Sequence, residues 1–280
     1  MAFTKMGPFV KWAGGKKQLL EKLHDRVPNK YGTYYEPFIG GGALLLNEKP
    51  GNAVIGDVNE QLINVYLQIQ KDPRAVIHAV SSIDESGACD KDYYMLIRER
   101  YNKKISAHEL DAECAGLMIW INKHCFNGLY RVNSKGLFNV PYNNKQTGKS
   151  IDEANIMSIG YYLQNSKVEI LCQDFETVCE SVKAGDFVYF DSPYIPVSET
   201  AYFTDYTKDG FSFEDHKRLA ELYKRLDALG AMVMLSNHNV DLVYELYDGF
   251  KIETVDVRRS INSDASKRVG KEVIITNYEV

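Results

Sequence analysis

Short apolar runs alternate with amphipathic stretches at both ends of the chain. Apolar runs bounded by turn residues predict β-strands, and they fall at residues 34–36, 53–55, 168–171, 187–190, 231–235 and 273–276, with 252–257 as a weaker candidate. Apolar residues at helical spacing predict helices over residues 18–23, 61–70 and 213–229. Ser212 and Gly230 suit the N-cap and the stop of the last helix. Strands that alternate with helices predict a doubly wound α/β sheet.

The middle of the chain has a different pattern. From about residue 71 onward, the pattern of residues predicts mostly helices. The stretch between 127 and 148 is polar and rich in Gly and Asn. Turn-forming pairs such as Asn127-Gly128 and Asn143-Asn144 break that stretch into loops. We therefore expect residues 71–160 to form an inserted, mostly helical recognition domain. Residues 1–70 and 161–280 are expected to form the domain that carries the chemistry.

Composition narrows the class of protein. The 280 residues are 45% hydrophobic and 25% charged, which is typical of a soluble globular protein. No apolar run approaches the ~18 residues of a membrane span, and the first residues lack the apolar core of a signal peptide. The five cysteines form no Cys-x-x-Cys pair, so we expect reduced thiols in a cytoplasmic protein that does not enter a membrane.

The basic residues are unevenly distributed along the chain. Although the formal net charge is −5, Lys and Arg gather at residues 1–30, 115–150 and 258–271, and the second of these segments contains no Asp or Glu. Three basic segments in an acidic protein predict one positive face, which suits a nucleic-acid partner. The six histidines show no metal-ligand spacing, so no metal site is predicted.

The segment after the first predicted strand indicates an adenosine-containing ligand. Its consecutive glycines, Gly40-Gly41-Gly42, let the backbone pass close to a ligand. Leu45 stands where the dinucleotide fingerprint requires a third glycine, so a nicotinamide cofactor is disfavoured. Asp57 ends the next strand, where a carboxylate can accept the hydroxyls of a ribose. Upstream, Trp12 either fills the core or stacks on an adenine, and Lys16 is placed to meet an anion.

The most informative segment is 185–196, where an apolar strand leads straight into Asp191-Ser192-Pro193-Tyr194. Open α/β sheets bind their ligands at the carboxyl ends of strands. The Asp191 carboxylate and the Ser192 carbonyl can accept both hydrogens of an exocyclic base amine and so direct its lone pair toward an electrophile. Tyr194 would stack on the base while Pro193 stiffens the turn. On these four residues alone, a strand followed by an ordinary Pro turn stays open as the alternative.

Taken together, the motifs resemble those of one family. The segments FVKWAGGK, EPFIGGGALL, Asp57-Val58-Asn59, FNGLYRVNSKGLFNVP, DSPY, LSN and EVIITNY occur in the order typical of Dam-type DNA adenine-N6 methyltransferases (D12 class, alpha group), close to members specific for GATC. The resemblance covers nearly the whole chain. It implies a Rossmann-like α/β fold and an S-adenosylmethionine-dependent enzyme. This enzyme would methylate N6 of an adenine flipped out of double-stranded DNA and would need no obligatory protein partner.

The resemblance also implies roles for individual residues. Catalysis is expected at Asp191, Ser192, Pro193 and Tyr194. The cofactor S-adenosyl-L-methionine is expected at Trp12, Lys16, Glu36, Phe38, Gly40, Gly42, Asp57, Asp174, Phe175 and Asp191, and DNA at Phe126, Asn127, Leu129, Arg131, Asn133, Lys135 and Pro141. In the second set, Phe126 matches an aromatic that wedges into the base stack. Arg131 matches an arginine that binds guanine, a contact that a guanidinium can make with two hydrogen bonds.

The chain departs from the family pattern at two places. Ser192 stands where Pro is usual, which keeps the carbonyl but loosens the turn, and Asn143-Asn144 stands where Gly-Arg is frequent, which removes a cation. Two alternatives stay open: a cytosine-N4 methyltransferase, which typically has Ser at the position of Asp191, and a DNA-binding relative with weakened catalysis. A cytosine-C5 methyltransferase is excluded because no proline is followed by the nucleophilic cysteine.

Overall fold

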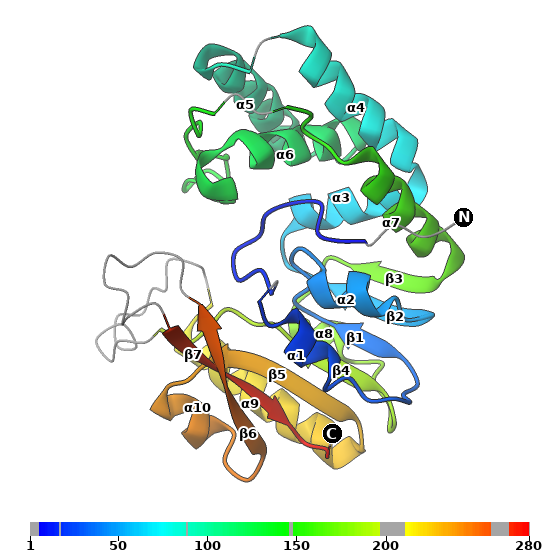
Figure 1. Cartoon of the computed structure of the whole chain (residues 1–280), viewed down its shortest axis with the longest axis vertical. Coiled ribbons are helices and arrows are strands. Elements are labelled where there is room, and N and C mark those ends of the chain that lie inside the picture. The colour runs from blue at the N-terminus through cyan, green and yellow to red at the C-terminus, as the bar shows by residue number, and fades with distance from the viewer. Residues whose placement is uncertain are drawn as a thin grey trace. The chain divides into compact units, whose positions relative to one another are not determined.

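The apolar runs form the strands of a mixed seven-stranded sheet in the computed structural model, which describes residues 6–16, 18–87, 89–145, 148–196, 211–258 and 269–279 (Figure 1). The strands are β1 (Tyr34–Glu36), β2 (Asn52–Gly56), β3 (Lys167–Leu171), β4 (Phe187–Phe190), β5 (Met232–His238), β6 (Lys251–Arg258) and β7 (Val269–Thr276). Every predicted strand is confirmed, including the weaker candidate at 252–257. The predicted α/β class is confirmed as well.

The chain divides into two compact units. The first consists of Met1–Gly15, Gly40–Gly51 and Asp57–Cys172, and the second of Lys16–Ile39, Asn52–Gly56 and Gln173–Val280. The first unit holds β3 and the helices of the middle of the chain, whereas the second holds the other six strands. The insertion of a recognition domain at residues 71–160 stays a prediction.

The sheet of the second unit places several loops at one edge. Strands β2, β1, β4 and β5 are parallel neighbours in that order, and their register pairs Tyr35 with Val188 and Val188 with Val233. Strand β7 runs antiparallel to β5, and β6 antiparallel to β7. The predicted doubly wound pattern therefore holds for the parallel strands β2, β1, β4 and β5. Beyond β5 it gives way to the antiparallel strands β7 and β6. Because parallel strands end at a common edge, the residues after β1 and β4 and the end of β5 meet there.

The helices of the second unit are α1 (Leu20–His24), α8 (Phe175–Val178), α9 (Phe213–Leu229) and α10 (Asp241–Leu246). Helix α9 has the predicted bounds because its termination signals are local. The Ser212 side chain accepts a hydrogen bond from the Asp215 backbone, and Gly230 ends the helix at φ 87° in the left-handed region. Its buried face packs on β5, where the Tyr223 hydroxyl donates to the Val233 carbonyl at 3.1 Å.

The first unit is mostly helical, as predicted for the middle of the chain. Its helices are α2 (Ala43–Glu48), α3 (Glu60–Lys71), α4 (Pro73–Ser86), α5 (Lys91–Ser106), α6 (Ala112–His124), the short 3₁₀ helix η1 (Phe126–Gly128) and α7 (Glu153–Asn165). Helix α6 packs against α3, α4 and α5. It carries the fully buried Trp120, whose indole N–H donates to Asp84 at 2.8 Å. No helix in the described part of the chain is long and apolar enough to cross a bilayer.

Candidate active site

Asp191 follows directly after the buried strand β4 and is paired with a cation. Its Oδ1 lies 2.6 Å from Nζ of Lys16 and accepts a hydrogen bond from the Ser236 hydroxyl at 3.2 Å. The Lys16 side chain is 6% exposed and that of Asp191 is 20% exposed, so the ion pair is largely shielded from water. Neither Oδ2 of Asp191 nor the Ser192 carbonyl accepts a hydrogen bond from any described residue. Two acceptors on adjacent residues thus remain available.

The protonation of Asp191 is set by opposing influences. Burial raises the pKa of this carboxyl above its usual value because the charged form loses hydration. The neighbouring Lys16 ammonium and the Ser236 hydroxyl lower the pKa, whereas the negative charge of Glu272 raises it further. The net effect is a raised pKa. Lys16 is therefore the main group that favours the ionised, acceptor form of Asp191, and Ser236 assists it.

Tyr194 shares this environment. The Lys16 ammonium lies 4.5 Å from the centroid of the Tyr194 ring, within the range of a cation–π contact. The phenol donates a hydrogen bond to Glu272 at 3.0 Å, and the ring meets His238 edge to face at a centroid distance of 4.9 Å. Burial, together with the charges of Asp191 and Glu272, raises the pKa of Tyr194 well above its usual value, so the phenol stays neutral.

Residues at the end of β5 hold the loop in place. The Asn237 side-chain oxygen accepts the Ile195 backbone N–H at 2.9 Å, and the His238 Nδ1 lies 2.8 Å from the Ile195 carbonyl. Ser236 links Asp191 to Tyr189, whose hydroxyl lies 3.0 Å from the serine oxygen. The sequence pointed to the LSN segment only as part of a family pattern. The contacts show that its residues position the Asp191–Tyr194 loop.

Two polar groups near this loop lack partners. The Ser192 side chain is 2% exposed and that of Asn237 is 1% exposed. The Ser192 hydroxyl and the Asn237 Nδ2 have no hydrogen-bond partner among the described residues. A buried donor without a partner is costly, which is consistent with a pocket that a ligand completes.

Glu36 and Phe38, at the end of β1, belong to the second unit, as do Lys16, Asp191 and Tyr194. Glu36 is buried at 2% exposure and accepts a hydrogen bond from the Tyr34 hydroxyl at 2.6 Å. The Phe38 ring stacks on Phe175 at a centroid distance of 5.3 Å and meets Phe190, the residue before Asp191, at 6.3 Å. Phe38 thus connects the segment at Phe175 to the end of β4.

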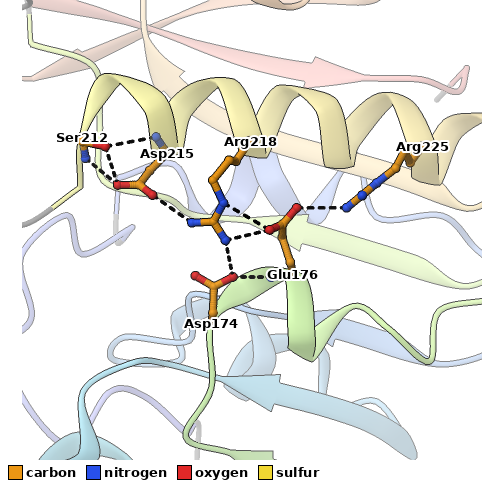
Figure 2. Close-up of polar contacts among 6 residues, drawn as sticks. All are labelled: Asp174, Glu176, Ser212, Asp215, Arg218 and Arg225. Atoms are coloured by element: carbon orange, nitrogen blue, oxygen red, sulfur yellow. Dashed lines mark hydrogen bonds and ion pairs between the residues drawn. The ribbon is translucent and has the colours of Figure 1, made fainter.

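Asp174 caps helix α8 and is held by an arginine of α9 (Figure 2). Its Oδ1 accepts the Glu176 backbone N–H at 3.1 Å and an N–H from Arg218 at 2.8 Å. Phe175, the next residue, is buried at 2% exposure, and the Arg218 guanidinium lies 4.8 Å from its ring centroid. The structure therefore brings Phe38, Asp174 and Phe175 together.

In the first unit, Asp57 fastens the glycine loop. Its carboxylate oxygens accept the Gly40 backbone N–H at 3.2 Å and that of Asn59 at 2.9 Å. Burial is the largest influence on the Asp57 pKa, which is raised although these backbone donors lower it. Gly40 and Gly42 have φ of 46° and 68°, which L side chains rarely adopt. A Cβ on Gly40 would also meet the Trp12 ring at 2.9 Å.

Trp12 stacks on Tyr130, with ring centroids 5.4 Å apart. The peptide before it is clamped by Asn122 of α6, a buried residue not singled out in the sequence. The Asn122 side chain accepts the Lys11 N–H at 2.8 Å and donates to the carbonyls of Lys11 and Gly128 at 2.9 and 3.0 Å. One side chain thus ties the segment of Trp12 to the turn that carries Phe126 and Asn127.

The residues expected to contact DNA all lie on the surface of the first unit. The set Phe126, Asn127, Leu129, Arg131, Asn133, Lys135 and Pro141 is exposed, with Phe126 at 50% and Leu129 at 42%. Isolated bridges pair Cys125 with Tyr142 and Val132 with Phe138, so the segment folds back on itself. Exposed apolar side chains beside cations suit an interface with DNA better than a plain solvent loop.

Two of these polar residues already have intramolecular partners. The Arg131 Nε donates to the Asn139 side chain at 2.8 Å, which leaves its Nη1 without a bond to any described residue. The Asn133 side-chain oxygen accepts the backbone N–H groups of Lys135 and Leu137, so it builds the turn itself. Arg131 is therefore oriented and still able to donate, whereas Asn133 has an evident structural task.

Comparison with known proteins finds matches along nearly the whole chain. The family model described as D12 class N6 adenine-specific DNA methyltransferase matches residues 12–261. The chain is 43% identical to the Type II methyltransferase M1.LlaDCHI of Lactococcus lactis subsp. cremoris, over 97% of this chain and 95% of that protein. It is 42% identical to the Type II methyltransferase M.MjaIII of Methanocaldococcus jannaschii, over 97% and 99%. The DNA adenine methylase of Escherichia coli K12 is 30% identical, over 97% and 95%.

Proposed function

We propose a specific chemistry for this chain from one premise: it belongs to the family of D12 class N6 adenine-specific DNA methyltransferases and is an enzyme that methylates DNA. We infer that S-adenosyl-L-methionine is its methyl donor and that its target is the adenine of GATC. Residues 71–160 would supply most of the target recognition. The observation that carries the proposal is the arrangement of Lys16, Asp191 and Tyr194 at the end of β4.

Asp191 and Ser192 are suited to activate an amine. An adenine N6 is a weak nucleophile because its lone pair is delocalised into the ring. The free Oδ2 of Asp191 and the Ser192 carbonyl can accept its two hydrogens, which pyramidalises the nitrogen and localises its lone pair for attack on a methyl group. One of these hydrogens leaves as a proton after the transfer, and the Asp191 carboxylate is placed to accept it. Lys16 holds Oδ1 and favours the ionised carboxylate. Catalysis then rests on positioning and on a preorganised electrostatic environment, with no covalent enzyme intermediate.

Tyr194 and the residues around it are suited to hold the flipped base. The Tyr194 ring is fixed by its hydroxyl bond to Glu272 and by its contact with His238. The Lys16 ammonium lies over one face of the ring, and we infer that a base stacks on the opposite face. A base–aromatic stack contributes about 1–3 kcal/mol, which offsets part of the cost of unstacking the base from the duplex.

The residues of the proposed cofactor set fit an adenosine. Each carboxylate oxygen of Asp57 accepts one backbone N–H and keeps a lone pair for a ribose hydroxyl. Phe38 and Phe175 offer aromatic surface for the adenine, and Asp174 offers a carboxylate oxygen for its amine. Glu36, Gly40, Gly42, Trp12 and Lys16 complete the proposed set. When bound, S-adenosylmethionine supplies a methyl group attached to a sulfonium, from which the neutral thioether is a good leaving group.

The proposed DNA contacts rest on the exposed segment of the first unit. Phe126 and Leu129 present apolar surface, and Arg131 presents a guanidinium oriented by Asn139. A guanidinium can donate to O6 and N7 of guanine, which is the commonest specific contact in the major groove. Cytosine-N4 methylation is not favoured, because the family model that matches the chain is described as adenine-specific.

The proposal is tested by mapping methylated bases in DNA. The gene is expressed in a host that lacks adenine methylation, and genomic DNA is sequenced for N6-methyladenine. We expect modification confined to the adenine of GATC, and none in cells that express Asp191→Ala. Methyladenine at another sequence would contradict the proposed target, while N4-methylcytosine would contradict the proposed chemistry.

A further inference from the structure

Arg218 of helix α9 joins three carboxylates in the second unit (Figure 2). Its Nη2 donates to Asp174 at 2.8 Å and to Glu176 at 2.7 Å, its Nε donates to Glu176 at 3.1 Å, and its Nη1 donates to Asp215 at 2.9 Å. The Arg218 side chain is 35% exposed and that of Asp174 is 40% exposed. The network is thus open to solvent, and its contribution to stability is small because water and salt screen such pairs.

The geometry of Asp174 suggests a different purpose for the network. Both hydrogen bonds that the described residues make to this carboxylate end on Oδ1, one from the Glu176 backbone and one from Arg218. Its Oδ2 accepts no hydrogen bond from the described part of the chain. A carboxylate fixed through one oxygen presents the other in a defined direction. That oxygen is an acceptor of the kind that an exocyclic amine requires.

Arg218 is itself held from the opposite side. Asp215 accepts a hydrogen bond from the Nη1 of Arg218. The Asp215 carboxylate is fixed in turn by the Ser212 backbone N–H and hydroxyl, at 2.8 and 2.7 Å, in the capping box that starts α9. The guanidinium also lies over the ring of the buried Phe175, 4.8 Å from its centroid. The N-terminus of α9 therefore fixes the guanidinium, which fixes the carboxylate of Asp174 beside an aromatic ring.

We propose that Arg218 is a positioning residue that makes the cofactor site selective for a purine with a 6-amino group over one with a 6-carbonyl group. The inference rests on the proposed function, in which Asp174 and Phe175 bind the cofactor's adenine. Arg218 acts through Asp174. Its positive charge offsets the repulsion between the carboxylates of Asp174 and Glu176, and its hydrogen bond to Oδ1 keeps Oδ2 directed at the amine. Without Arg218, the two carboxylates would repel each other and Asp174 would lose its fixed orientation.

Arg225 provides a matched control on the same helix. It donates to Oε1 of Glu176 at 3.0 Å and makes no contact with Asp174 (Figure 2). Arg225→Ala removes one cation from the same network and leaves both hydrogen bonds to Asp174 intact. If the network served stability alone, neither Arg218→Ala nor Arg225→Ala would change the preference of the folded protein between two ligands, whereas a positioning role predicts a change in Arg218→Ala only.

The test compares two non-reactive ligands by calorimetry with the full-length protein. One is S-adenosylhomocysteine, and the other is its inosine counterpart, in which the 6-amino group is replaced by a carbonyl oxygen. We expect the wild type to bind the adenine form about 10- to 100-fold more tightly, as for a hydrogen bond to a charged group. Arg218→Ala should lose most of this ratio, Arg218→Lys should retain part of it, and Arg225→Ala should keep it.

Each outcome bears on one claim. A wild type that binds neither ligand would overturn the proposed function and the inference with it. A wild type that binds both equally, or an Arg218→Ala protein that keeps the full ratio, would overturn the inference and leave the proposed function standing. Equal loss in Arg218→Ala and Arg225→Ala would reduce Arg218 to a structural residue. If Arg218→Ala fails to fold, Asp215→Asn, which loosens Arg218 from its other side, takes its place and must lower the ratio.

Discussion

The Nζ of Lys16 lies 2.6 Å from Oδ1 of Asp191 and 4.5 Å from the ring centroid of Tyr194. The anion that Lys16 meets is therefore the carboxylate of the proposed catalytic tetrapeptide, Asp191-Ser192-Pro193-Tyr194. A buried ion pair of this kind fixes one carboxylate oxygen and leaves the other for a substrate. It also couples the charge of Asp191 to the presence of Lys16, which makes the pH dependence of the reaction informative.

Lys16→Met should move the acid side of the pH profile. In the proposed mechanism Asp191 accepts the amine hydrogens in its ionised form, so kcat should fall as the pH drops through the pKa of Asp191. Burial raises that pKa and Lys16 lowers it. Removing the ammonium should raise the pKa further and shift the acid limb of kcat to higher pH, measured with saturating cofactor and DNA. Lys22→Met, whose exposed ammonium bonds the Asp256 carbonyl, is the control and should leave the limb in place. An unmoved limb in Lys16→Met would argue against the coupling.

Ser192→Pro should preserve activity. The Ser192 hydroxyl is buried without a partner, and no described residue accepts its backbone N–H, so Pro removes no hydrogen bond seen in this part of the chain. The ring stiffens the unfolded chain, and a compatible Pro adds about 0.4–1 kcal/mol of stability. Thermal melting and a steady-state assay measure both effects, with Ser192→Ala as the control. Loss of activity in both variants would show that the hydroxyl itself has a role.

Arg131→Ala and Lys145→Ala should have distinct effects on DNA binding. Arg131 is oriented by Asn139, so its loss should lower discrimination at one guanine by about 1–3 kcal/mol. Lys145 is exposed, and its loss should weaken binding to all sequences alike and flatten the salt dependence. Titrations of duplexes that carry or lack GATC, at several salt concentrations, separate the two. A uniform loss in Arg131→Ala would identify Arg131 as a phosphate contact.

Asp57→Ala should weaken cofactor binding by about 1–3 kcal/mol, because charge-assisted hydrogen bonds to the ribose are lost. The same change frees the backbone N–H groups of Gly40 and Asn59, so stability must be measured beside affinity. Asp72→Ala is a matched control, since Asp72 also accepts two backbone N–H groups but caps α4. Calorimetry should show a loss of affinity in Asp57→Ala alone, and unchanged affinity in a folded Asp57→Ala would refute the assignment.

The sequence predicted best those features that depend on neighbouring residues. Helix α9 has its predicted bounds because Ser212 and Gly230 are adjacent to it, and each strand was visible as an apolar run. The segment of Asp191 could be found because its four residues are contiguous. Its supports could not be assigned, because Ser236 comes 45 residues after Asp191 and Glu272 comes 78 residues after Tyr194. Their positions depend on the pairing of β4 with β5 and of β5 with β7.

The same limit applies to Asp174 and Trp12. The partner of Asp174 is Arg218, 44 residues away on a helix whose polar face gives no sign of it. For Trp12, the sequence offered the core or an adenine as partner, whereas the described ring stacks on Tyr130. The antiparallel pair of β6 and β7 was also not distinguished from a continued doubly wound pattern, because strand direction leaves no mark in a short apolar run.

The rate of methyl transfer by Asp191→Ala tests the central claim most directly. A single-turnover assay on a GATC duplex measures the chemical step, and a separate titration measures DNA affinity. We predict that the substitution lowers the rate of transfer by at least about 100- to 1,000-fold, as for the loss of one preorganised electrostatic contact, while DNA affinity stays close to that of the wild type. Transfer at a substantial fraction of the wild-type rate by folded, DNA-bound Asp191→Ala would contradict the account.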